Sequence, residues 1–129
     1  MDKIGVMEIE RKFLVKNKEF MNLFHESFDI MQGYFFSNEK MSARIRKQKT
    51  FETTEYNIVV KVNDKYNDRR EGDPIMQMEY VVQVPTEEGE KLLAKCENIV
   101  EKTRYIVNYE GDLYEVDVFH GKNEGLIIA

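Results

Sequence analysis

The sequence has little of what marks a secreted or membrane-anchored chain. Among its 129 residues there is one cysteine, Cys96, so no internal disulfide can form, as is usual for a reducing, intracellular setting. It has no apolar run near the roughly 20 residues that a membrane-spanning helix needs. The first residues, Met1-Asp2-Lys3, do not lead into the apolar core of a signal peptide. We therefore expect a soluble cytoplasmic protein with no membrane partner.

The chain also lacks an excess of positive charge. It has 24 acidic and 19 basic side chains, giving a net charge of -5, which argues against a wide nucleic-acid-binding surface. An acidic protein can still concentrate positive potential in one cavity, so the placement of the charges matters more than their sum. The length predicts a single domain, 1–129.

Helical periodicity is limited to two short segments. One is 18–28, with Asn17 as N-cap, and the other is 86–97, where Thr86 follows Pro85 and can act as the cap. Many strands with only two helices predict a mainly β (α+β) fold, with an antiparallel sheet curled into a barrel. The predicted strands are 6–15, 30–37, 41–49, 55–63, 75–84, 101–109, 112–119 and 125–129.

Within these strands, charged residues alternate with apolar ones. Because successive side chains of a strand point to opposite faces, Arg44 and Arg46 share a face opposite Ile45, and Lys61 lies opposite Val60. Such alternation is typical of an ordinary solvent face, and that interpretation stays open. However, the charges are sorted, with carboxylates on some strands and basic groups on others. A closed sheet would gather them at one centre: Glu8, Glu10, Lys12, Arg44, Arg46, Lys61, Glu79, Lys102, Arg104, Glu115 and Asp117.

A centre of this composition has a chemical use. Guanidinium groups match the oxygens of phosphate in a bidentate geometry. Carboxylates among them are useful if a cation bridges them to the phosphates, as Mg²⁺ does when it binds one or two carboxylates together with substrate oxygens. The pattern therefore predicts a binding site for a phosphate-bearing polyanion and a divalent cation, a combination that stabilises charge in phosphoryl transfer.

These residues resemble the CYTH superfamily, the triphosphate tunnel metalloenzymes, over nearly the whole chain. The family signature Glu-x-Glu-x-Lys stands here as Glu8, Glu10 and Lys12. Further family motifs follow in the same order: Gln32-Gly33-Tyr34, Arg44-Ile45-Arg46, Lys61, Lys102-Thr103-Arg104, and Glu115-Val116-Asp117-Val118-Phe119 before Gly121.

The resemblance implies an eight-stranded antiparallel barrel with a polar tunnel, and hydrolysis of a triphosphate that depends on Mg²⁺ or Mn²⁺. It implies metal binding by Glu8, Glu10 and Asp117, with Glu79 and Glu115 as additional acidic candidates. Lys12 with Tyr34 resembles a dyad that activates the attacking water. The residues implied to bind phosphate are Lys12, Arg44, Arg46, Lys61, Lys102 and Arg104.

Two departures from the family pattern affect the expected metal site. Val81 stands where the family carries a second glutamate after Glu79. The sequence also ends at Ala129, where the family continues into a strand with two further glutamates. Three explanations stay open: a piece of a longer chain, a naturally short protein, or a strand supplied by another molecule. We expect reduced catalysis or a borrowed strand, and a two-fold homodimer is one way to supply it.

Three functions are compatible with this sequence. The first is a metal-dependent triphosphatase acting on inorganic tripolyphosphate. The second is an adenylate cyclase of class IV type, although no feature of the sequence demands an adenine pocket. The third is a module that binds triphosphates or organic phosphates with little turnover. Phosphate release and cyclic AMP formation distinguish them.

Overall fold

The computed structural model describes residues 5–10, 13–15, 20, 24–63 and 75–129, and for 5–10, 75 and 76 it describes the backbone only. Within these residues, eight strands form one sheet with the strand order β1-β5-β4-β3-β2-β6-β7-β8, and the chain forms one α-helix. The strands are β1 (Gly5–Glu10), β2 (Phe24–Ser37), β3 (Met41–Lys49), β4 (Thr54–Asn63), β5 (Ile75–Val84), β6 (Ile99–Tyr109), β7 (Asp112–His120) and β8 (Ile127–Ile128), and α1 is Thr86–Ala94.

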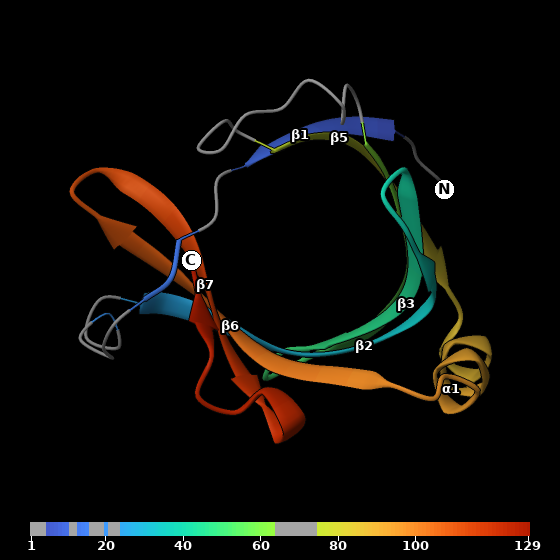
Figure 1. Cartoon of the computed structure of the whole chain (residues 1–129). Helices are drawn as coiled ribbons and strands as arrows, with labels where there is room; N and C mark the ends of the chain where they lie inside the picture. The colour runs from blue at the N-terminus through green and yellow to red at the C-terminus, as the bar shows by residue number, and fades with distance from the viewer. Residues whose placement is uncertain (1–4, 11–12, 16–19, 21–23, 64–74) are drawn as a thin grey trace. The chain divides into compact units, whose positions relative to one another are not determined.

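The mainly antiparallel β fold confirms the predicted class. Strand β1 runs antiparallel along β5, and β6 runs antiparallel along β7, as Figure 1 shows. Between the described residues of β1 and β8, which end the strand order, no pairing is present, so the sheet is not closed into the predicted barrel. In the described part of the chain, no helix has the length and apolar character that a membrane crossing requires.

The predicted helix over 18–28 is wrong for residues 24–28. Residues 24–28 belong to β2, which begins at Phe24. The aromatic ring of Phe24 packs edge-on against Tyr105, with ring centroids 5.0 Å apart. Aromatic side chains favour strands when they find a partner on a neighbouring strand, so this tertiary contact overrides the local helical period.

Other boundaries also differ from the predictions. Helix α1 ends at Ala94 rather than at residue 97, and its N-cap is Pro85 without a side-chain cap, so Thr86 does not act as the cap. The predicted strand 6–15 is interrupted, because β1 ends at Glu10. The backbone N–H of Phe13 donates to Ala129 at 2.9 Å instead.

The chain divides into two compact units. Unit 1 comprises residues 1–11, 32–47 and 55–99, and unit 2 comprises 12–31, 48–54 and 100–129. Strands β2 and β3 contribute residues to both units. The expectation of a single domain stays a prediction.

In unit 1, α1 packs on one face of the sheet at two glycines. A Cβ at Gly33 would lie 2.5 Å from the Cβ of Cys96, which follows the helix, and a Cβ at Gly89 would lie 2.3 Å from the ring of Tyr56. No larger residue fits at either position without a shift of its neighbours. The helix therefore covers the face that carries Gly33 of β2 and Tyr56 of β4.

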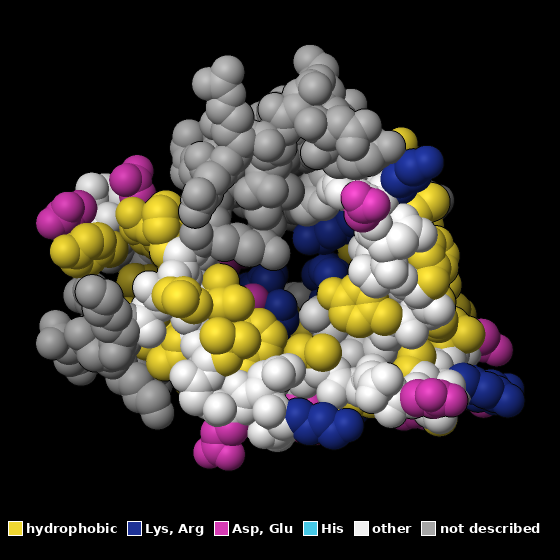
Figure 2. Space-filling view, in the orientation of Figure 1, with side chains coloured by type: hydrophobic (Ala, Val, Ile, Leu, Met, Phe, Trp, Pro, Cys, Tyr) yellow, Lys and Arg dark blue, Asp and Glu magenta, His cyan; other side chains and the backbone are white. Residues whose placement is uncertain are grey.

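In unit 2, the hairpin of β6 and β7 turns at Glu110 and Gly111, which have positive φ angles of 51° and 86°. Such a pair of left-handed residues matches the twist of a two-residue hairpin. Val107 and Val116 are buried in this unit. Several large apolar side chains of the described chain nevertheless reach the surface, where apolar groups are yellow in Figure 2.

Candidate functional site

The face of unit 1 opposite α1 carries polar side chains. Because Gly33 faces the helix, its neighbours on β2, Gln32 and Tyr34, point to the other side of the sheet. Tyr56 faces the helix in the same way, so Lys61 of β4 also points away from it. We call this side the polar face of unit 1, defined by Gln32, Tyr34, Arg44, Arg46, Asn57, Lys61, Gln77 and Glu79.

Arg44 is the buried cation of this polar face. Its residue is 8% exposed, and its Nη1 donates to the hydroxyl of Tyr34 at 3.2 Å. The guanidinium carbon also lies 5.8 Å from the centroid of the Tyr34 ring, within cation–π range. The Nε of Arg44 is buried and has no hydrogen-bond partner in the structure. Since Tyr34 is neutral, neither contact supplies a counter-charge to Arg44.

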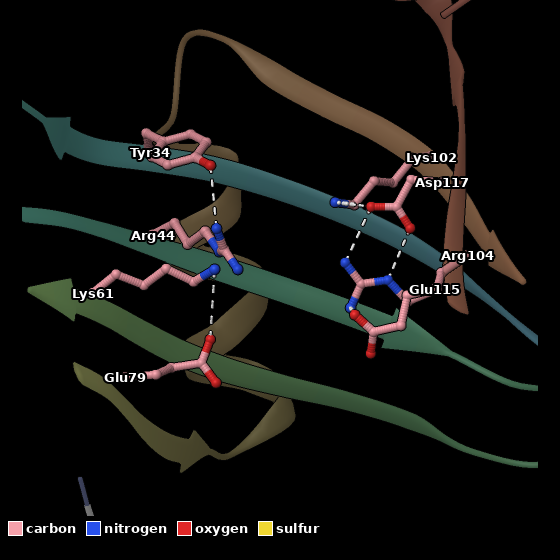
Figure 3. Close-up of polar contacts among 8 residues, drawn as sticks. All are labelled: Tyr34, Arg44, Lys61, Glu79, Lys102, Arg104, Glu115 and Asp117. Carbon is pink, nitrogen blue, oxygen red and sulfur yellow. Dashed lines mark hydrogen bonds and ion pairs between the residues drawn. The ribbon is translucent and has the colours of Figure 1, made fainter. Parts of the chain in front are cut away.

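Lys61 and Glu79 form a looser pair on the same face. They stand directly opposite each other in the antiparallel register of β4 and β5. The Nζ of Lys61 lies 3.7 Å from a carboxylate oxygen of Glu79, and the side chains are 18% and 22% exposed. Figure 3 shows this pair next to Arg44 and Tyr34, with the four side chains coming from four neighbouring strands.

Unit 2 carries a tighter cluster around Asp117 of β7. The Nζ of Lys102 donates to Oδ2 of Asp117 at 2.7 Å. Arg104 donates from Nε to Oδ1 at 2.8 Å and from Nη2 to Oδ2 at 3.1 Å, which is the bidentate arrangement drawn in Figure 3. Glu115 lies 3.5 Å from Arg104 but is largely exposed. Asp117 thus binds the buried Lys102 and the partly exposed Arg104 at once.

The two cations determine the ionisation of Asp117. Burial by itself raises the pKa of this carboxyl, because it penalises the charged form. The hydrogen bond and charge of Arg104, followed by the charge and hydrogen bond of Lys102, outweigh that penalty and lower the pKa below its ordinary value. Asp117 is therefore a carboxylate at neutral pH.

The burial of three charged side chains excludes the interpretation that they lie on an ordinary solvent face. Arg44, Lys102 and Asp117 are each 8% exposed. Charged residues are almost never so deeply buried unless they are paired, because desolvation of an isolated charge is costly. These three charged residues therefore do not lie on an ordinary solvent face.

Only some of the predicted metal ligands lie in the part of the chain that the structure describes. Among the described residues, no group of three or more histidine, cysteine or acidic side chains could hold a metal ion. Both carboxylate oxygens of Asp117 accept hydrogen bonds from cations, which leaves this residue poorly suited to a metal. The side chains of Glu8 and Glu10 and all of Lys12 lie outside the described part. The described carboxylates alone do not fit a divalent-metal site.

Three buried polar residues escaped the sequence prediction: Gln32, Asn57 and Gln77, which are 4%, 8% and 8% exposed. Each lies an even number of positions from a predicted residue on its strand, as Gln32 does from Tyr34. The same period of two would have found them, but neutral amides carry no charge to single them out.

Comparison with solved structures agrees with the fold. A conserved hypothetical protein of Pyrococcus furiosus aligns with a TM-score of 0.62 at 18% identity, covering 97% of this chain and 76% of that one. A protein of Pyrococcus horikoshii OT3 aligns with a TM-score of 0.61 at 22% identity, covering 93% and 74%. Both likenesses concern the fold alone.

The sequence comparison is more specific. No model of a protein family matches the chain. An inorganic triphosphatase of Acetivibrio thermocellus, however, is 34% identical over 124 residues, which are 95% of this chain and 71% of that protein. This sequence likeness identifies the chain as a β protein of the CYTH type. Within that superfamily, the chain belongs to the family of this inorganic triphosphatase.

Proposed function

We propose that the chain is a hydrolase that cleaves inorganic tripolyphosphate with the help of Mg²⁺ or Mn²⁺. The observation that carries the proposal is the burial of Arg44 on a sheet face without a carboxylate partner in its recorded contacts. A guanidinium in this state gains most from an anionic ligand with several oxygens, which a tripolyphosphate provides. The relationship to an inorganic triphosphatase supports the same substrate class.

The residues of unit 1 have distinct roles in this proposal. Arg44, Arg46 and Lys61 bind phosphate oxygens, and Glu79 offsets part of the charge of Lys61. Tyr34 helps to activate the attacking water. Because Tyr34 accepts a hydrogen bond from Arg44, its oxygen is kept beside a phosphate-binding group.

In unit 2, Lys102 and Arg104 contribute further phosphate contacts. Asp117 holds both cations in place, and it also compensates their charge when no phosphate is bound. A bound divalent cation would neutralise phosphate charge, with Glu8 and Glu10 as its proposed ligands.

Two assays test the proposal on the whole chain. Phosphate release from tripolyphosphate is measured with Mg²⁺, with Mn²⁺ and with EDTA, and cyclic AMP formation from ATP is measured under the same conditions. We expect phosphate release that EDTA abolishes, and no cyclic AMP. Cyclic AMP would favour the cyclase, and binding without either product would favour a binding module.

The metal assignment has its own control. Glu8→Gln and Glu10→Gln should raise the Mg²⁺ concentration needed for half-maximal activity, because each loses a charged oxygen ligand. Glu79→Gln serves as the matched variant, since Glu79 pairs with Lys61 in the structure. An equal Mg²⁺ requirement in all three variants and the parent would remove Glu8 and Glu10 from the metal site.

A further inference from the structure

Gln32 is the most deeply buried polar side chain of the polar face of unit 1. The residue is 4% exposed, and its Oε1 atom is buried without a hydrogen-bond partner in the structure. A buried acceptor without a donor costs about 1–3 kcal/mol. Native proteins keep few such groups, and a retained one calls for an explanation in terms of function or a bound molecule.

The backbone places Gln32 beside the groups assigned to the reaction. Gly33 packs against Cys96 on the face of the sheet that the helix covers. Because neighbouring side chains of a strand alternate, Gln32 and Tyr34 project on the opposite face. Two positions along a strand correspond to about 7 Å. Tyr34 in turn accepts a hydrogen bond from Arg44 at 3.2 Å. The unpartnered oxygen therefore belongs to the same face as a buried phosphate-binding guanidinium.

The chemistry of Oε1 restricts what it can bind. An amide oxygen only accepts hydrogen bonds, and so do the oxygens of an ionised triphosphate. A phosphate group therefore cannot satisfy Oε1, whereas a water molecule can, because it donates. Hydrolysis needs such a water next to the terminal phosphate, and positioned glutamines orient attacking waters in other phosphoryl-transfer enzymes.

Resting on the proposed function, we propose that Gln32 accepts a hydrogen bond from the water that attacks the terminal phosphorus. The water oxygen forms the new P–O bond while the bridging P–O bond breaks, giving orthophosphate and pyrophosphate. One proton of the water passes to a phosphate oxygen, and the other stays directed at Oε1. An amide oxygen is too weak a base to remove a proton, so Gln32 orients the water and does not ionise it.

The test compares Gln32→Met with Gln32→Glu. Methionine keeps the length of the side chain and loses the acceptor, whereas glutamate keeps an acceptor oxygen. For Gln32→Met we expect kcat for tripolyphosphate to fall by about 100-fold, the scale on which one positioned polar group acts. KM should stay within about twofold of the parent, because the phosphate contacts are untouched. Gln32→Glu should recover a measurable part of kcat.

Gln77→Met is the matched control for the loss of an amide. Gln77 is also buried on this face, but it has an interaction partner. Replacing a partnered amide should lower the Tm, whereas replacing the unpartnered Gln32 should leave the Tm unchanged or raise it. A Tm that falls equally in both variants, with an unchanged kcat for Gln32→Met, would show that Gln32 is structural.

The remaining outcomes are also decisive. An increase in KM at constant kcat for Gln32→Met would make Gln32 a substrate-binding group and overturn the water assignment. If the parent is active and Gln32→Met equals it in kcat and KM, the proposal for Gln32 fails while the triphosphatase function stands. If the parent binds tripolyphosphate without releasing phosphate, the proposed function fails, and the role of Gln32 fails with it.

Discussion

The two units surround their cations with different electrostatic partners. In unit 2, Lys102 and Arg104 hold one carboxylate, Asp117, through three hydrogen bonds of 2.7–3.1 Å. In unit 1, Arg44 contacts only the neutral Tyr34 in its recorded interactions, and Lys61 lies 3.7 Å from Glu79. The difference teaches that burial of a cation has two explanations. In unit 2, an internal carboxylate balances the positive charge. In unit 1, a bound anionic ligand would balance it.

The largest expected effect is the loss of the counter-ion in unit 2. Asp117→Ala removes the carboxylate that both Lys102 and Arg104 bind, and leaves the largely exposed Glu115 as an acidic neighbour of Arg104. We expect the free energy of unfolding to fall by about 3–5 kcal/mol, the usual result of removing one partner from a buried ion pair. Urea unfolding measures it, and tripolyphosphate should restore part of the loss. A change below 1 kcal/mol, on the order of an exposed ion pair, would erase the contrast between the units.

The next effect is on ligand binding in unit 1. Arg44→Ala should weaken tripolyphosphate binding by about 1.5–3 kcal/mol, because one charge-assisted contact is lost. Folding should change less, since Tyr34 is the partner recorded for its guanidinium. Arg104→Ala is the matched variant and should destabilise the chain, because it loses two bonds to Asp117. Thermal melts with and without tripolyphosphate separate the two effects, and equal ligand-induced shifts in the Arg44→Ala variant and the parent would contradict the assignment.

A smaller effect on the free energy of unfolding is expected at acid pH. The folded chain has a lowered pKa at Asp117, so the stabilisation from its ion pairs is complete above the ordinary carboxyl pKa. It is lost as the pH falls through the lowered value. Asp117→Asn removes this titration, so its unfolding free energy should decline less than that of the parent between about pH 4 and the acid limit of folding. If the free energy of unfolding falls equally with pH in the Asp117→Asn variant and the parent, other carboxyl groups dominate acid unfolding.

The smallest effect concerns the loose pair of unit 1. Glu79→Gln should change the unfolding free energy by less than about 1 kcal/mol, because Lys61 and Glu79 are separated by 3.7 Å and partly solvated. Tripolyphosphate should bind no more weakly, since a negative charge near Lys61 is removed. Calorimetric titration checks this, and a clearly weaker binding would mean that Glu79 contributes to the site in another way.

Much of the candidate site was predictable because it depends on the alternation of side chains along a strand, which is a local property. Strand β3 has the predicted bounds 41–49, and the period of two places Arg44 on the side opposite Ile45. The same period predicted Lys61, Lys102 and Asp117. It did not reveal Gln32, because a neutral amide on a strand looks like any exposed polar residue until its burial is known.

The errors arose where distant segments compete with local preference. Residues 24–28 have an apolar spacing typical of a helix, yet they form part of β2. The ring of Phe24 contacts Tyr105, which lies far away in sequence. No window of neighbouring residues contains that contact, so the period alone could not decide between helix and strand.

The sequence by itself determined the family, the mainly antiparallel class and the residues that share each face of a strand. Those properties follow from the alternation of side chains, which is a consequence of backbone geometry within a few residues. Only the tertiary structure decided which face is buried and which cation has a counter-ion. Gly89 of helix α1 packs against Tyr56, Gly33 packs against Cys96 just after the helix, and Asp117 meets both Lys102 and Arg104 across a hairpin. Desolvation and ion pairing depend on the groups that surround a charge, and those groups are brought together by folding.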